Sequence, residues 1–345
     1  VDDDVPGIAP GLEVPASRLG ATLAAAVQRI SAAPSVGVLA DAVAQVMRDL
    51  TGYDRVMVYR FDPDGHGMVM AEARDARLPP LLGHHYPASD IPQQARALYL
   101  RHRVRMLVDV DAPTAPLLAS GLATPPLDMS MCALRAMSPI HLQYLRNMGV
   151  TGSMSVSLVR EGQLWDLVAA HHMTPRRLRC SLRTAAELVG EVASTRITAI
   201  ENYAHAQVAL MVRRLEQRLV EATSTEGDWR YALFRNPRTL LQPLEATGVV
   251  LFHDDELLTA GEVPSTPELH ALLDWVRRQP GHEPLATSAI GTTQPELRSL
   301  TPTASGVLAV RLSASRPDYL IWLRKEQLLT VTWAGDPRKP MVGDN

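Results

Sequence analysis

The stretch SMSVSLVREGQLWDLVAAHH, residues 153–172, sets the fold class. Met154, Val156 and Leu158 alternate with three serines, and side chains that alternate in this way point to opposite faces of a β-strand. A Glu-Gly pair then provides a turn into a second extended run. The stretch therefore predicts an antiparallel hairpin with one apolar face and one polar face.

A second hairpin is predicted upstream. Residues 55–61 and 68–73 are rich in β-forming side chains and are separated by the turn sequence DPDG at residues 62–65. Before them, residues 21–50 carry an apolar helical stripe that Pro34 interrupts. Two hairpins flanked by helices predict an α+β domain in which helices pack on an antiparallel sheet.

A single long helix is predicted for residues 182–223, which contain no proline and keep an apolar stripe throughout. A periodic helix of that length is typical of a coiled coil or of a spine between domains, although burial inside one domain is the alternative. Beyond it, strands are predicted at residues 249–252, 306–312, 319–323 and 328–333, with a helix at 268–278. The chain is therefore expected to form two α+β domains joined by a spine helix.

Composition excludes several classes of protein. At 345 residues and 46% hydrophobic, the chain is long enough for two cores, and a net charge of −3 provides no general attraction to nucleic acid or to an anionic membrane. No apolar run reaches membrane-spanning length, and the acidic, proline-rich start is unlike a signal peptide. We expect a cytoplasmic location. Valine at position 1 and the abrupt C-terminus indicate a piece of a longer protein.

Chemistry-bearing residues gather in two segments, GHHYPASDIPQQARALYLRHRVR at 83–105 and RAMSPIHLQYLRNMGVTGSMS at 135–155. Arginine forks match carboxylates, and alternating serine hydroxyls can assist them. The combination predicts a site for a large planar ligand that carries carboxylates. Taken alone, RHRVR is typical of a solvated surface and His141 of a structural histidine. The candidate residues are Asp90, Tyr99, Arg105, Arg135, His141, Tyr144, Ser153 and Ser155.

Neither a metal site nor a catalytic centre is expected. The pairs His84-His85 and His171-His172 are adjacent, and neighbours on a strand point to opposite faces, so one pair seldom gives two ligands to an ion. The chain has no P-loop, no G-x-S-x-G and no H-E-x-x-H motif. Two cysteines are too few for a disulfide framework.

The motifs PASDIP, SPIH and YLRNMGV, in that order, resemble the chromophore-binding GAF domain of bacterial phytochromes. The resemblance extends to YDRVMVYRFDPDGHGMVMAEAR at 53–74 and to the histidine pair at 171–172. The segment YLIWLRKEQLLTVTWAGDPRKP at 319–340 resembles the PHY domain where its tongue hairpin begins, although the PR-x-SF return strand is not in the sequence. The implied domains are a loose segment at 1–20, GAF at 21–180, a connecting helix at 181–223 and PHY at 224–345. Both domains would be GAF-like.

This resemblance implies a red/far-red photoreceptor that binds biliverdin, a linear tetrapyrrole. Asp90 and His141 would lie near the pyrrole nitrogens, and His171 would meet the far ring. The walls would come from Met57, Tyr59, Tyr86, Tyr99 and Tyr144, the ring plane would be covered by Ile91 and Pro92, and the propionates would be held by Arg105, Arg135, Ser153 and Ser155. Photoisomerisation would refold the tongue, and the spine helix of a parallel homodimer would relay the change to an output domain, such as a histidine kinase, or to a response regulator.

Three departures from the family pattern qualify this interpretation. Plant-type members attach the chromophore through the residue before the histidine, here Ile140, which cannot form a thioether, and Cys132 lies eight residues earlier. Binding is therefore expected to be non-covalent. Ala170 and Asp166 replace the more common cysteine and glycine, and Asp166 is expected to face solvent. The alternative function is a non-photochemical GAF-type sensor of another small molecule, or a dimerisation scaffold.

Overall fold

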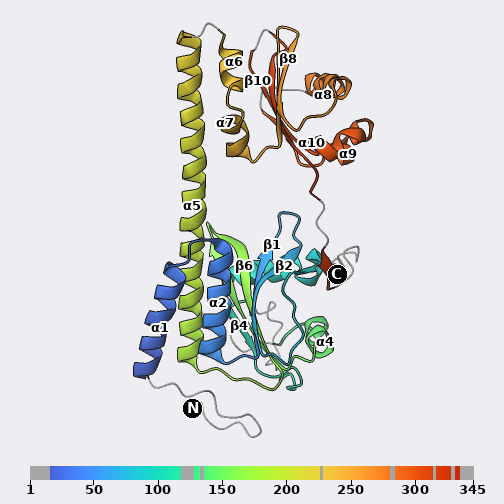
Figure 1. Cartoon of the computed structure of the whole chain (residues 1–345). Coiled ribbons are helices and arrows are strands. Elements are labelled where there is room, and N and C mark those ends of the chain that lie inside the picture. The colour runs from blue at the N-terminus through green and yellow to red at the C-terminus, as the bar shows by residue number, and fades with distance from the viewer. Residues whose placement is uncertain are drawn as a thin grey trace. The chain divides into compact units, whose positions relative to one another are not determined.

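The computed structural model describes residues 16–116, 118, 128–132, 136–225, 228–279, 284–313, 316–327 and 331–334. It separates into two compact units (Figure 1). Unit 1 comprises Val1–Asn202 with Val331–Asn345, and unit 2 comprises Tyr203–Thr330. Both are α+β, each with a largely antiparallel sheet and flanking helices, so the predicted fold class is confirmed.

Unit 1 is built on a seven-stranded sheet in the order β12-β3-β2-β1-β6-β5-β4. All neighbours pair antiparallel except β12, which pairs parallel with β3. Both predicted hairpins are confirmed, as β1–β2 and β5–β6. The strands are β1 Arg55–Phe61, β2 Gly67–Arg74, β3 His84–Tyr86, β4 Val104–Leu107, β5 Gly152–Arg160, β6 Gln163–His172 and β12 Thr332–Trp333.

Three helices cover one face of this sheet, namely α1 Ala16–Ser31, α2 Val36–Thr51 and the start of α5 Cys180–Thr225. Pro34 separates α1 from α2 as the sequence predicts. Ser35 caps α2 through its hydroxyl, and Gly52 ends it with a left-handed φ of 66°. Met154, Val156 and Leu158 of β5 point into this core, each at most 1% exposed. The apolar half of the predicted alternation therefore faces the helices.

The opposite face of the sheet is covered by shorter elements from the two motif-bearing segments. The 3₁₀ turn η1 Ala88–Asp90 and the helix α3 Gln93–Arg101 follow β3, and α4 Pro139–Asn147 precedes β5. Tyr99 of α3 and Tyr144 of α4 both pack against an apolar cluster on this face. We call this side of the sheet the site face.

Helix α5 is continuous over 46 residues, which confirms the predicted long helix. Its first part is packed in unit 1, where Leu182, Val189 and Ile197 are at most 4% exposed. From residue 202 onward, most of its described side chains are exposed, including Tyr203 at 68%. The packing that stabilises α5 within the chain is therefore concentrated in its first part.

Unit 2 contains a five-stranded antiparallel sheet in the order β8-β7-β11-β10-β9. One face packs on α6 and α7, and the other packs on α8 with the short helices around residues 290–304. The predicted strands near 249, 306 and 319 and the helix near 268 are confirmed. The elements are α6 Trp229–Phe234, α7 Arg238–Leu241, η2 Gln242–Leu244, β7 Gly248–His253, β8 Glu256–Gly261, α8 Thr266–Arg278, β9 Leu285–Thr287, α9 Ile290–Thr293, η3 Pro295–Leu300, α10 Thr301–Ala304, β10 Gly306–Arg311 and β11 Tyr319–Arg324.

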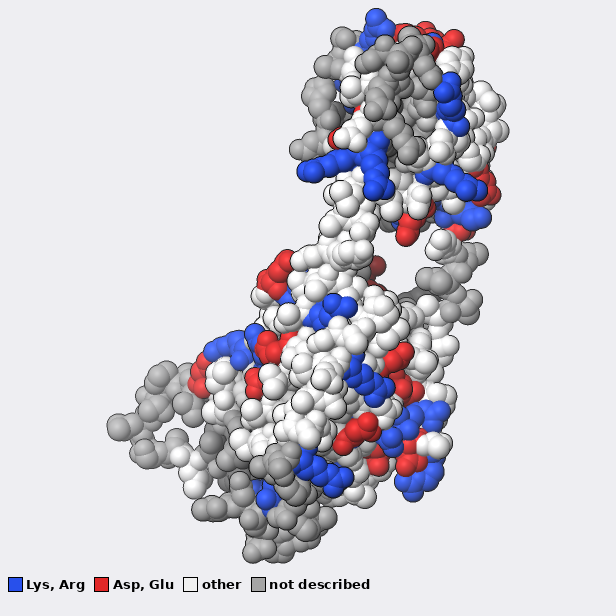
Figure 2. Space-filling model, turned by 60° about the vertical axis from the view of Figure 1, so that its left-hand side comes forward, with Lys and Arg blue, Asp and Glu red and all other residues white. Residues whose placement is uncertain are grey.

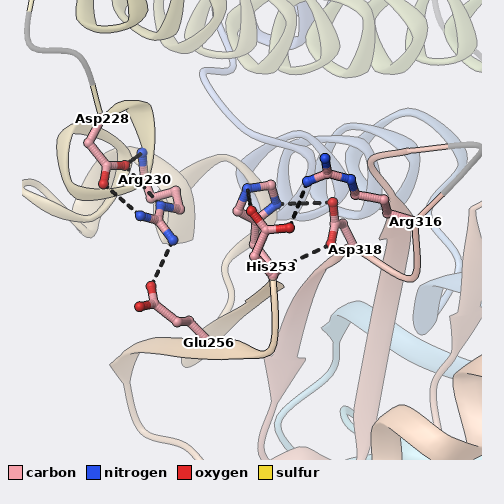
Figure 3. A network of polar contacts seen from close by, with 7 residues as sticks. Asp228, Arg230, His253, Glu256, Arg316 and Asp318 are labelled. Carbon is pink, nitrogen blue, oxygen red and sulfur yellow. Dashed lines mark hydrogen bonds and ion pairs between the residues drawn. The ribbon is translucent and has the colours of Figure 1, made fainter.

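A polar network ties α6, the β7–β8 turn and the start of β11 together (Figure 3). Arg230 of α6 reaches Glu256 at 2.7 Å. The ring of His253 lies between two carboxylates, 3.0 Å from Asp318 and 3.3 Å from Asp254. Asp318 is only 4% exposed, and a buried carboxylate needs such partners. The network therefore fixes the segment that follows the long helix to the sheet of unit 2.

The strand expected at residues 328–333 differs in extent and position from the prediction. Residues 328–330 lie outside the described residues, and the observed strand β12 joins the sheet of unit 1, not the second domain. The Trp333 ring lies 5.2 Å from that of His66, and Ala334 N–H donates to the His85 carbonyl at 2.9 Å. Alternation in a sequence indicates a strand but not which sheet edge accepts it.

Asp166 was expected to face solvent, and this expectation is wrong. The residue is 0% exposed and pairs in register with Leu158 and Arg60, so it points to the helix-covered face. A bulge leaves Trp165 without a partner in the β5–β6 register, and its ring lies 4.3 Å from the Arg60 guanidinium carbon. Arg60 Nε in turn lies 3.7 Å from Asp166 Oδ1. The carboxyl group is therefore buried beside Arg60.

We expect Asp166→Asn to flatten the pH dependence of stability. Burial, only partly offset by Arg60, raises the pKa of Asp166 to about 8, whereas an unfolded aspartate ionises near pH 4. Between these values the unfolded state releases a proton that the folded state keeps, so stability falls as pH rises. The wild type should lose on the order of 3 kcal/mol more than the variant between pH 5 and 8 in chemical unfolding followed by circular dichroism. Parallel curves for Asp166→Asn and wild type would contradict this; the exposed Asp49→Asn serves as control.

Candidate functional site

The site face is organised as rows that run across β4, β5, β6, β1 and β2. Residues that are opposite one another in an antiparallel ladder project to the same side, so each row gathers side chains from distant segments. The first row is Leu107, Ser153, His171, Arg55 and Arg74; the second is Arg105, Ser155, Ala169, Met57 and Glu72; the third is Ser157, Leu167, Tyr59 and Val69. Polar groups thus dominate one end and apolar groups the other.

An aromatic cluster forms the apolar end. Tyr59 and Tyr86 are each 7% exposed, and their rings lie 5.8 Å apart. Met57 and Leu167 pack in the same cluster, with Ile91 at its edge. Desolvation raises the pKa of the Tyr59 phenol above its ordinary value. The cluster therefore offers neutral hydroxyl groups within an apolar wall.

A glycine on β2 makes room for one of these rings. A Cβ atom at Gly67 would clash with the ring of Tyr59. Tyr59 can therefore lie against the backbone of β2 only because position 67 has no side chain.

Asp90 and Tyr144 approach this cluster from η1 and α4. Tyr144 shares a hydrogen bond with Tyr86. Desolvation raises the pKa of Tyr144, and the nearby Tyr86 and Asp90 raise it further. The Asp90 turn is supported by Arg96, whose Nε donates to the Ile91 carbonyl at 2.8 Å and whose guanidinium also bonds the Gly65 carbonyl. This places the carboxylate of PASDIP beside three phenols.

Arg105 lies close to the two rings that α3 and α4 contribute. Its guanidinium carbon is 5.2 Å from the centre of the Tyr99 ring. Burial lowers the pKa of His141, and the Arg105 charge lowers it further. His141 in turn stacks on Tyr144 at 6.3 Å and 19°. The structure therefore places Arg105 opposite Ser155 on the site face and His141 within reach of its charge.

His171 is the one buried histidine of the expected set. It is 7% exposed, and its Nδ1 atom has no hydrogen-bond partner among the described residues. Burial, then the charge of Arg55, and then His141 lower its pKa to about 3. A buried nitrogen without a partner costs free energy unless a ligand satisfies it. This is the observation that favours a polar ligand on the site face.

Two expected residues, Arg135 and Pro92, are not part of this constellation as described, and neither are the two residues considered for chromophore attachment. Arg135 lies outside the described residues, so its role stays a prediction. Pro92 is exposed and caps the start of α3. Ile140, in the position of plant-type attachment, is 77% exposed on α4. Cys132 is partly exposed and forms no disulfide bond.

Sequence reasoning missed the charged residues at the end of the first two rows. Arg55 and Glu72 form an ion pair of 3.0 Å with side chains 5% and 4% exposed, and Arg74 lies 3.6 Å from the same carboxylate. The signal was available, because Arg55 has the same parity as Met57 and Tyr59 in RVMVYRF. Their importance comes from burial, which the pattern alone did not reveal.

Other kinds of site find no support in the described part of the chain. Its His, Cys, Asp and Glu side chains form no group of three or more suited to a metal ion. None of its helices is both long and apolar enough to cross a membrane. On the face drawn in Figure 2, basic and acidic side chains are intermixed.

Comparison with known protein families matches both halves of the chain. The GAF domain model matches residues 35–200, and the model described as the phytochrome region, PHY, matches residues 212–345. Similar curated proteins include cyanobacterial phytochrome B of Nostoc sp., 37% identical over 87% of this chain and 40% of that protein. A bacteriophytochrome of Xanthomonas campestris is 36% identical over 90% of this chain and 51% of that protein. The chain thus spans about half or less of these relatives.

Solved structures give the same result over the whole fold. The bacteriophytochrome RpBphP3 from R. palustris aligns with a TM-score of 0.84 and 33% identity, covering 95% of this chain and 66% of that one. The photosensory core module of the Stigmatella aurantiaca phytochrome aligns with a TM-score of 0.80 and 33% identity, covering 96% and 66%.

We expect Gly67→Ala to disturb the aromatic cluster selectively. The added methyl group would displace the Tyr59 ring, and overpacking of this kind costs about 1–3 kcal/mol. The free energy of unfolding, measured with denaturant, should fall by that amount. Gly37→Ala in α2 is the control, since nothing lies within 4 Å of a Cβ there; equal stabilities of the two variants would show that the ring is not confined.

Proposed function

The chain belongs to the phytochrome family, and we propose that its GAF domain binds a linear tetrapyrrole, biliverdin, as the sensor of a red/far-red photoreceptor. The observation that carries this proposal is the arrangement of the site face. It combines a buried aromatic wall, a carboxylate-binding corner and a buried His171 nitrogen without a partner among the described residues. These are complementary to an elongated apolar ligand with polar edges and two carboxylates.

The residues divide into three roles toward such a ligand. Arg105, Ser153 and Ser155 would receive propionate oxygens, with Arg135 as the predicted second cation. Asp90 and His141 would face the pyrrole nitrogens, one as an acceptor and the other as a neutral ring. His171 would meet the far ring of the ligand.

When bound, biliverdin supplies absorption of red light and isomerisation about a double bond. Tyr59 and Tyr86 would provide a smooth wall beside the ring that turns, and desolvation keeps both phenols neutral. The hydroxyl groups of Tyr86 and Tyr144, which hydrogen-bond each other, can each accept or donate a hydrogen bond to the ligand ring in its new position. The wall therefore permits two ligand arrangements without adding a charge.

We propose non-covalent retention in this chain. Ile140 has no thiol, and Cys132 stands eight residues before Ile140, too far along the chain to replace it directly. Burial of the tetrapyrrole and its propionate contacts would then hold it. The domain boundaries at residues 180 and 223, a cytoplasmic location and a parallel dimer along α5 also remain predictions.

Signal output is proposed to lie outside this chain. The GAF and PHY domains are not catalytic, so kinase activity would belong to a following domain or partner. The long helix α5 joins the residues of the two units without a break and is the natural relay. The alternative, a non-photochemical sensor or scaffold, is not favoured, because the phytochrome-region model matches residues 212–345 and the similar proteins are phytochromes.

Adding biliverdin to the purified chain should produce a red absorption band that changes reversibly under red and far-red light. Denaturation in acid urea followed by gel filtration should release the pigment, because no thioether is expected. Failure of the intact chain to take up biliverdin would favour the alternative function. Pigment that stays with the denatured chain would overturn non-covalent retention only.

Arg105→Ala should weaken biliverdin retention by about 10- to 100-fold, since a charge-assisted contact to a carboxylate contributes roughly 1.5–3 kcal/mol. The measurement is the dissociation constant from absorbance titration. Arg101→Ala is the matched control, because this exposed arginine of α3 pairs with the exposed Asp128 instead. Equal affinities for the two variants would remove Arg105 from the site.

A further inference from the structure

The first row of the site face places a permanent cation directly beside the most buried histidine. Arg55 of β1 and His171 of β6 are opposite in the ladder, so their side chains project to the same side. Ser153 flanks His171 from β5, and His141 approaches it from α4. Arg55 is therefore the nearest fixed charge on the strands that flank this ring.

Arg55 is itself held by a set of buried partners. Glu72 lies 3.0 Å from its Nε and 3.6 Å from Arg74, and the Arg55 guanidinium also donates to the Pro79 carbonyl. Glu72 accepts the Leu81 N–H at 3.0 Å. The carboxylate is thus fixed from the loop after β2 as well as by two cations, and it prevents Arg55 from moving away.

The cluster of Arg55, Arg74 and Glu72 carries a net positive charge. Two guanidinium groups and one carboxylate leave one net positive charge at the end of the first two rows. A protonated His171 would add a second positive charge in a buried space, where charges interact strongly. The effect agrees in direction with the low pKa of His171, for which Arg55 is the largest cause after burial.

We propose that the Arg55–Glu72 ion pair is a positioning element that fixes His171 as a neutral ring toward the ligand. This inference rests on the proposed function of the site face. A neutral imidazole presents one N–H and one lone pair, whereas an imidazolium presents two N–H groups. By keeping His171 neutral, the Arg55–Glu72 pair determines which polar groups of a ligand this ring can bind. That preference would then not change with pH.

The experiment reads His171 directly in the chain without pigment. Ring nitrogens of ¹⁵N-histidine-labelled protein are followed by NMR between pH 4 and pH 8, and a His171→Gln spectrum assigns the signal. The wild-type ring should remain neutral over this range. In Arg55→Gln the cation is lost while Glu72 stays beside Arg74, so His171 protonation should move upward by about one pH unit or more and enter this range near pH 4.

Further variants separate charge from structure. Arg55→Lys keeps the charge and should behave as wild type. The double variant Arg55→Gln with Glu72→Gln removes both charges and should shift the midpoint less than Arg55→Gln alone. Arg60→Gln is the control, since Arg60 lies on the same strand but points to the opposite face, toward Asp166.

The order of the midpoints decides the proposal. A His171 ring that stays as neutral in Arg55→Gln as in wild type, or equal protonation in Arg55→Gln and Arg60→Gln, would overturn it. If Arg55→Gln does not fold, the double variant replaces it: His171 should protonate at higher pH there than in Arg60→Gln, and equal titrations would overturn the proposal. Biliverdin uptake is measured separately. If the variants titrate as expected but the chain takes up no biliverdin, the proposed ligand is wrong and the role of the Arg55–Glu72 pair stands.

Discussion

The antiparallel pairing of β1 with β6 is the constraint on which the site depends. Strand residues alternate between faces, so one register assigns Val58 and Val168 to the helix-covered core and sends Arg55 and His171 to the other side. A slip of one residue would exchange the two sets and place charge in the core. The apolar packing of α1, α2 and α5 against one face is therefore what holds the polar rows in place on the other.

Buried acidic side chains are paired differently on the two faces of the unit 1 sheet. On the site face, Glu72 is shared by two arginines and backbone N–H groups, which is the way buried ions are usually tolerated. On the helix face, the cation beside Asp166 is the more distant Arg60, which offsets only part of the effect of burial, so the pKa of Asp166 rises. Burial beside one distant cation therefore favours the protonated form of this carboxyl group.

The sequence predicted local features well and long-range partners poorly. Both hairpins of unit 1, the break at Pro34 and the long helix follow from periodicity and turn residues, which act over a few positions. The sequence motifs indicated which residues belong to one site. The row that joins Ser153, His171 and Arg55, however, depends on the pairing of β1 with β6, whose residues are more than a hundred positions apart in the sequence. Two expectations failed for this reason. Pairing opposite Leu158 and Arg60 decided the side of Asp166, and an open sheet edge decided the partner of β12.

Helix α5 is buried in its first part and largely exposed later, and this difference affects how stable its helical hydrogen bonds are along its length. Starting a helix is costly, whereas adding residues to an existing one is nearly neutral. The buried turns near Leu182 and Val189 supply that start, and the exposed turns beyond residue 202 extend it without much packing of their own. Amide hydrogen exchange along this one helix should therefore be graded, slow in the anchored turns and faster in the exposed ones.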